Sequence, residues 1–383
     1  MRRLIAFVAA GLTLATQAGA QPPLPSYLPP ASCLTTASAV NVVAGPMLTR
    51  LRPPLASLVA GEAFDLRGAT ASVPLADGSW SPIVIDAWEL PDLCVSGGTV
   101  WGNHPLSASW IEVHAINHYA AMSRSTSGIV EGLAAHNVLD GVRMNGGIGA
   151  FTLRDAWLSY IRDDCLENDT LRSGLVERVL FDGCFTGLST TPGSSQIATA
   201  DGSAETVVIR DSLLRMEPMP RPFDNDSEPT HAGTYLSMPG YAVEFGHGAV
   251  WKRLTDGRDV RWEVRGHVIL YLEGGVTTLS AAAYDVPPLA ACDDLTIIWL
   301  GDGTRYGMPL ATDYPGTLPA NCRTLTITTD PLVGRALWEQ AVNAWFAAHP
   351  GVGLPADPAS CKLGLRRPLP GGYRVPHWPR FAP

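Results

Sequence analysis

VEGLAAHNVLDGV at residues 130–142 is followed by LRDAWLSYIRDDC at 153–165 and VERVLFDGCFTGL at 176–188, so one pattern recurs every 23 residues. Its apolar positions form two columns, which are Val138, Ile161 and Cys184, and Val142, Cys165 and Leu188. A fixed period of this length, with short alternating apolar runs, is typical of a solenoid whose coils stack over a shared core. The sequence therefore predicts an all-β fold, a right-handed parallel β-helix.

A polar column runs beside the apolar ones and contains Asp140, Asp163 and Thr186. Asp164 follows Asp163 directly. Residues level with one another on stacked strands lie about 4.8 Å apart. We therefore expect Asp140, Asp163 and Asp164 to meet on one outer face.

The N-terminus has the features of a secretory signal peptide, residues 1–20. It begins Met1-Arg2-Arg3, continues with an apolar run too short to span a bilayer, and reaches small residues before Ala20. No later stretch is apolar over the length that a membrane helix needs. We expect a secreted or periplasmic protein without membrane insertion.

The rest of the chain divides by composition. We expect a Pro-rich linker at 21–37, the β-helix at 38–330, a helix at 331–349 and an irregular tail at 350–383. The helix is indicated by Asp330 as N-cap and Pro331 as its first residue. Residues 110–116 alternate as a strand should.

Net charge and cysteine content restrict the possible binding partners and the compartment of the protein. The formal net charge of −9 argues against nucleic acid as a partner, because such binding needs a basic surface. Seven cysteines are compatible with an oxidising compartment. Cys165 and Cys184 fall in apolar columns, which predicts burial rather than bridging, whereas Cys292 and Cys322 are predicted to form a disulfide.

The segment RDDCLEND at 162–169 concentrates the candidate chemistry. Neighbouring carboxylates suit glycoside hydrolysis, because one can be kept protonated as the acid while another activates water. Asp140, Asp163 and Asp164 are the predicted catalytic residues. The predicted substrate-binding residues are Arg162, Arg143, His118 and Glu167.

Two other interpretations of the same carboxylates stay open. Asp163, Asp164 and Glu167 could bind calcium, which takes several oxygen ligands and would neutralise a uronate substrate. Alternatively, the aspartates could accept backbone N–H bonds at a turn and have only a structural role.

The segment Asp163-Asp164-Cys165-Leu166 resembles the Asp-Asp-Cys motif of polygalacturonase-type glycoside hydrolases, with Asp140-Gly141 one coil earlier. The resemblance implies Asp163 as the acid, and Asp140 and Asp164 as holders of the water. Thr186 stands where that family has its histidine. Residues 163–169, 181–187 and 296–301 make the chain similar to secreted bacterial β-helix proteins of the pectate-lyase-like superfamily.

Two functions are compatible with these patterns. The first is an enzyme, a hydrolase or lyase, that acts on an acidic polysaccharide through the aspartates. The second is a non-catalytic β-helix that binds glycan or has a structural role at the cell surface.

Overall fold

The computed structural model describes residues 31–105, 107–147, 149–193, 196–217, 219–220, 235–236, 245–246, 248–272, 285–300, 314 and 316–352. The predicted signal peptide and most of the predicted tail lie outside the described residues. None of the helices in the described ranges is both long enough and apolar enough to cross a membrane.

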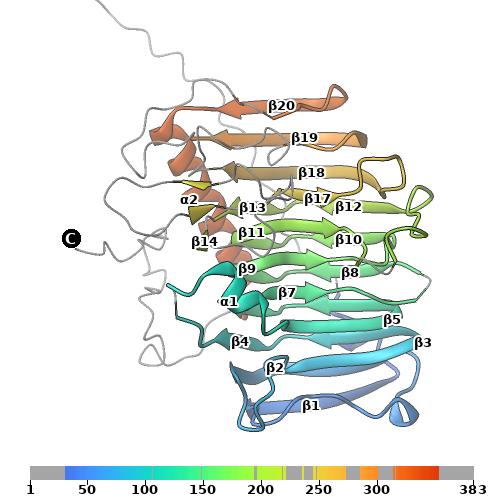
Figure 1. Ribbon diagram of the computed structural model, residues 1–383. Coiled ribbons are helices and arrows are strands. Elements are labelled where there is room, and N and C mark those ends of the chain that lie inside the picture. The colour runs from blue at the N-terminus through green and yellow to red at the C-terminus, as the bar shows by residue number, and fades with distance from the viewer. Residues whose placement is uncertain are drawn as a thin grey trace, which may run out of the picture.

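Parallel strands dominate the described part of the chain, and in Figure 1 they are layered from β1 at the bottom to β20 at the top. The strands of the first half are β1 (Ala39–Pro46), β2 (Glu62–Val73), β3 (Ile83–Ser96), β4 (Thr99–Gly102), β5 (Tyr119–Glu131), β6 (Ala134–His136), β7 (Asp140–Arg143), β8 (Phe151–Arg154), β9 (Trp157–Glu167) and β10 (Gly174–Glu177). Those of the second half are β11 (Leu180–Thr190), β12 (Thr206–Arg210), β13 (Leu213–Met216), β17 (Trp251–Arg253), β18 (Arg261–Leu272), β19 (Leu289–Trp299) and β20 (Cys322–Thr328).

The remaining elements are short or lie outside this parallel sheet. They are the 3-10 helices η1 (Cys33–Thr35) and η2 (Leu55–Ser57), helices α1 (Trp110–His114) and α2 (Pro331–Ala348), and the antiparallel strands β14 (Met219–Pro220), β15 (Tyr235–Leu236) and β16 (Phe245–Gly246).

The predicted open right-handed parallel β-helix is wrong, and so is the resemblance to the pectate-lyase-like and polygalacturonase-type families that rested on it. The parallel pairings close on themselves in a ring of twelve strands. The ring runs β2, β4, β6, β9, β11, β13, β18, β12, β10, β8, β5, β3 and back to β2. The fold is thus an all-parallel closed barrel, with β1, β7, β17, β19 and β20 as extra strands.

Long strands explain why the sheet closes. β5, for example, pairs at its beginning with β7 and near its end with β8, so one continuous strand belongs to two parts of the ladder. β11 likewise pairs with β13 at its start and with β17 at its end. The repeat shows which residues are level, but it does not show that a strand continues from one part of the sheet into the next.

The 23-residue offset holds for only part of the repeat. Ile161 pairs with Cys184 as the first column requires. Beyond a register shift between Cys184 and Thr186, however, Leu166 rather than Cys165 is level with Leu188, and Asp164 rather than Asp163 is level with Thr186. An irregularity of one residue reverses which side chains face the core.

Disulfides and helices correct two further predictions and confirm two. Cys165 and Cys184 form a disulfide, contrary to the prediction, because both are buried and their Cα atoms lie 5.8 Å apart, within the range that a disulfide spans. Cys292 and Cys322 are bonded as predicted. Cys33–Cys94 is a third disulfide that the spacing did not suggest.

Helix α2 confirms the predicted C-terminal helix, with Asp330 accepting N–H bonds from Leu332 and Val333. It buries Trp338 and Trp345 against the strands, beside Leu180 and Ile269. Figure 1 shows α2 along one side of the layered strands. Residues 110–114 are helical, not a strand, because Ser109 and Glu112 form a capping box.

Candidate active site

Four buried carboxylates, Asp140, Asp163, Asp164 and Glu167, form what we call the acidic cluster. Asp140 begins β7, and the other three belong to β9. Two basic residues, Arg143 and Lys252, complete the cluster. Arg143 is level with Glu167 on the neighbouring strand. Lys252 is level with Ser189, which is in turn level with Glu167. Strands β7, β9, β11 and β17 therefore place the whole set in one part of the sheet.

Asp140 is firmly held within this cluster. Its Oδ2 accepts bonds from Arg143 Nε at 2.9 Å and Nη2 at 2.6 Å. Its Oδ1 accepts the backbone N–H of Asp164 at 3.2 Å. Arg143 also forms an ion pair with Glu167. Asp140 thus joins β7 to β9, and this part of the cluster matches the structural interpretation of the aspartates.

Asp163 and Asp164 are held less completely. The Oδ1 atom of each is buried and has no hydrogen-bond partner among the described residues. Lys252 Nζ lies 3.6 Å from Asp164 Oδ2, and His114 Nε2 lies 4.0 Å from Asp163 Oδ2. Buried polar atoms are nearly always hydrogen-bonded, so unpaired carboxylate oxygens on two consecutive residues need an explanation.

Burial and crowding favour the neutral acids. Burial raises the pKa of Asp163 well above its usual range, and the adjacent Asp164 raises it further. Burial also raises the pKa of Asp140 to about 6, against the opposing effect of Arg143. The pKa of Glu167 is raised well above its usual range by burial, with Asp140 adding to the effect. The cluster can therefore retain protons at neutral pH.

Basic side chains mark the more exposed side of the cluster. The side chains of His114, Lys252 and Arg143 are 38%, 23% and 19% exposed, whereas those of the carboxylates they contact are at most 10% exposed. The surrounding acids raise the pKa of Lys252 despite its burial, so its ammonium group is charged. An approaching molecule would meet the charged side chains of Lys252 and Arg143 before the acids.

Two predicted substrate-binding residues lie elsewhere. Arg162 is completely buried, and its guanidinium donates to Asn137 and to the carbonyl of Ala108. His118 is also buried, where its Nε2 accepts the N–H of Leu139 and lies 3.1 Å from His104 Nε2. Arg143 and Glu167, in contrast, do belong to the cluster.

The predicted calcium ligands do not form an open cation site. Oxygens of Asp140, Asp164 and Glu167 lie within 4.8 Å of one another, and Asp163 is not part of that group. Each of the three is already paired with a fixed cation, Arg143 or Lys252. A resident calcium ion, which needs six to eight oxygen ligands, would have to displace both, so the donor set does not fit it.

The sequence did not predict Lys252 or His114 as residues of this site. Lys252 lies 62 residues after Thr190 and follows no repeat, so no spacing connects it to the aspartates. His114 ends helix α1, and the Ser109–Glu112 capping box was the available signal for that helix.

Comparisons with known proteins gave no relative. No protein-family model matches the chain, no curated protein matches it, and no solved structure matches it.

Proposed function

We propose that this protein is an enzyme that hydrolyses an acidic polysaccharide by acid–base catalysis at the acidic cluster. The observation that carries the proposal is the pair of buried, unpaired Oδ1 atoms of Asp163 and Asp164. Buried carboxylates left without a partner are destabilising, and such groups concentrate where a substrate or a proton completes the arrangement.

The two aspartates have environments suited to different roles. Asp163, whose pKa is raised by burial and by Asp164, is the proton donor to the leaving oxygen. Asp164, paired with Lys252, accepts the proton of the attacking water. Glycoside hydrolysis requires such a pair, in which one carboxyl group donates a proton and the other accepts one. Asp140 acts as a positioning residue through its bond to the Asp164 backbone.

The acidic nature of the substrate is supported by the basic groups on the exposed side. Lys252 and Arg143 would attract an anionic chain toward carboxylates that would otherwise repel it. This attraction should weaken as the salt concentration rises, because these groups are partly exposed.

A non-catalytic glycan-binding protein is the second candidate. The observation that favours it is the bond between Asp140 and the Asp164 backbone, which is what a purely structural aspartate would make. In that case glycan binding would survive the replacement of Asp163.

The test is release of reducing ends from a panel of acidic polysaccharides by the purified protein. We expect Asp163→Asn to lower the rate by about 100-fold or more, the usual contribution of a general acid. Asp201→Asn, which alters an exposed aspartate in a loop, is the control and should keep full activity. Circular dichroism and melting temperature verify that both variants fold. An active Asp163→Asn variant, or a wild-type protein that cleaves nothing, would overturn the proposal.

A further inference from the structure

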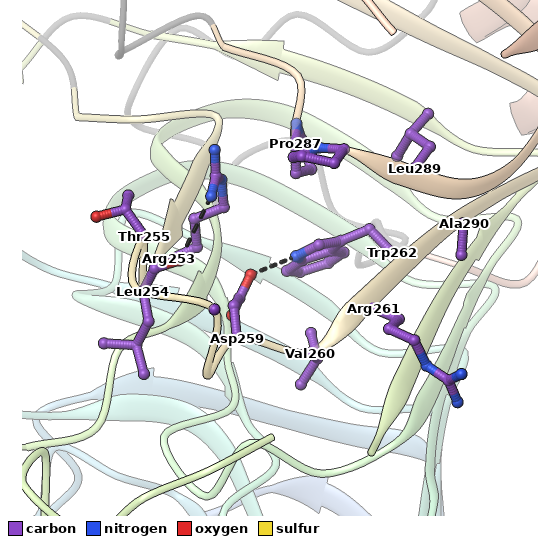
Figure 2. Close-up of a pocket in the computed structure, with 12 residues that line it drawn as sticks. Arg253, Leu254, Thr255, Asp259, Val260, Arg261, Trp262, Pro287, Leu289 and Ala290 are labelled. Atoms are coloured by element: carbon purple, nitrogen blue, oxygen red, sulfur yellow. Dashed lines mark hydrogen bonds between the residues drawn. The ribbon is translucent and has the colours of Figure 1, made fainter. Parts of the chain in front are cut away.

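A second candidate site lies where β17 ends and β18 and β19 begin. It is a pocket of about 410 Å³, within the range typical of small-molecule sites. Apolar residues make most of its lining, among them Val260, Trp262, Pro287 and Leu289. Figure 2 shows the pocket with the hydrogen bond between Asp259 and Trp262 near its centre.

Asp259 is a fixed acceptor in this pocket. Its Oδ1 accepts a bond from Thr190 Oγ1 at 2.7 Å, and its Oδ2 accepts one from Trp262 Nε1 at 2.7 Å. Each oxygen keeps a second lone pair for a hydroxyl donor. Burial raises the pKa of Asp259, while Arg253 opposes that shift.

Arg253 supplies the positive charge. Among the described residues it is in no ion pair within 4.0 Å, and its only hydrogen bond to them is a long one from Nη1 to the carbonyl of Leu254 at 3.4 Å. A guanidinium has five N–H donors, so most of its donor capacity is available for a planar anion such as a carboxylate.

The pocket is separate from the acidic cluster. Lys252 and Arg253 are consecutive residues of β17, and successive side chains of a strand point to opposite faces. The consecutive residues Ser189 and Thr190 of β11 also belong to different sites. Ser189 is level with Glu167 of the acidic cluster, whereas Thr190 bonds Asp259 of the pocket. A ligand here therefore does not require the proposed catalytic activity.

We propose that this pocket binds a monosaccharide acid of the uronate class. Its carboxylate pairs with Arg253, its ring hydroxyls donate to Asp259, and the apolar face of the sugar ring packs on Pro288 and Ala290, the exposed apolar residues of the lining. These three features together distinguish a uronate from a neutral sugar, which lacks the carboxylate, and from a simple dicarboxylate, which lacks the ring.

Isothermal titration of the purified protein with D-galacturonate, D-galactose and succinate tests this inference. We expect saturable binding of galacturonate and at least 10-fold weaker binding of the other two. Arg253→Gln should weaken galacturonate binding by about 10-fold or more, as loss of a charged hydrogen bond implies. Arg265→Gln is the matched control, because Arg265 lies on the same strand β18, pairs with Glu263 and is not among the residues that line the pocket.

Each contrary result is decisive. Equal binding of galactose or succinate, no galacturonate binding, or unchanged affinity in Arg253→Gln overturns the inference. Loss of binding in Asp163→Asn would place the ligand at the acidic cluster and would also overturn it. Retained galacturonate binding in an inactive Asp163→Asn variant supports the inference. If the wild-type protein binds galacturonate but cleaves no polysaccharide, the inference stands and only the catalytic proposal fails.

Discussion

Two buried charged clusters on neighbouring strands differ in how completely they are paired. In the first, Arg215 of β13 bonds Asp182 Oδ1 at 2.8 Å, bonds the Asp182 carbonyl at 3.3 Å and pairs with Glu217. No side-chain atom of these three residues is buried without a partner. In the acidic cluster, four carboxylates share Arg143 and Lys252, and Asp163 and Asp164 each keep an unpaired oxygen.

The difference separates a structural arrangement from a candidate functional one. One arginine that satisfies two acids leaves nothing for a ligand to complete. An excess of buried acid raises pKa values, which is a property of many catalytic carboxylates but also a cost to the fold. Charge balance, rather than the number of acidic residues, distinguishes the two clusters.

Removing Arg215 should have the largest effect on stability. Arg215→Met removes the cation that Asp182 and Glu217 share among the described residues, and breaking a buried pair in this way costs about 3–5 kcal/mol. Urea denaturation followed by circular dichroism measures the change. Arg261→Met, at an exposed arginine that bonds only one carbonyl among the described residues, should change the free energy of unfolding by less than about 0.5 kcal/mol. Equal effects of the two substitutions would show that the Arg215 cluster is not structural.

The sequence predicted the neighbours in the sheet better than its closure. The pairing of Ile161 with Cys184 follows from a 23-residue period, and helix α2 follows from Asp330 and Pro331. Closure depends on β5 and β11 bending between two sets of partners, and no residue pattern marks that continuation.

The site was predicted in the same partial way. Asp140 and Asp164 do meet, since Asp140 bonds the Asp164 backbone, but all three predicted aspartates are buried and do not lie on an outer face. The shifted register at Thr186 and the arrival of Lys252 depend on tertiary structure outside the repeat. Arg162 was assigned to the wrong side because adjacent residues of a strand face opposite ways.

The second largest effect should be a change in pH dependence when Asp163 is neutralised. Because the pKa of Asp163 is raised in the fold, its contribution to stability is fully present below about pH 4 and is lost as the pH rises through the raised value. Asp163→Asn removes that loss. The free energy of unfolding of the variant relative to wild type should therefore increase from pH 4 to pH 8, by about 1.4 kcal/mol or more.

Asp65→Asn is the control for this pH series. Arg67 lowers the pKa of Asp65, so its contribution is present above the unfolded value and is lost as the pH falls. The difference between Asp65→Asn and wild type should therefore stay nearly constant from pH 4 to pH 8, because Asp65 titrates only near and below pH 4 in both states. A parallel pH trend for the two variants would show that Asp163 is not held as a neutral acid.

The smallest effect is expected at Thr186, which is level with Asp164 and has a buried Oγ1 with no partner among the described residues. Thr186→Val removes an unsatisfied hydroxyl without changing the side-chain shape, so the free energy of unfolding should fall by less than about 0.5 kcal/mol, or rise. Thr190→Val is the matched control on the same strand. It removes a 2.7 Å bond to Asp259 and should cost about 1.5–3 kcal/mol. A costly Thr186→Val would mean that this hydroxyl is paired in solution, and the acidic cluster would then be closer to the satisfied Arg215 cluster than its unpaired oxygens indicate.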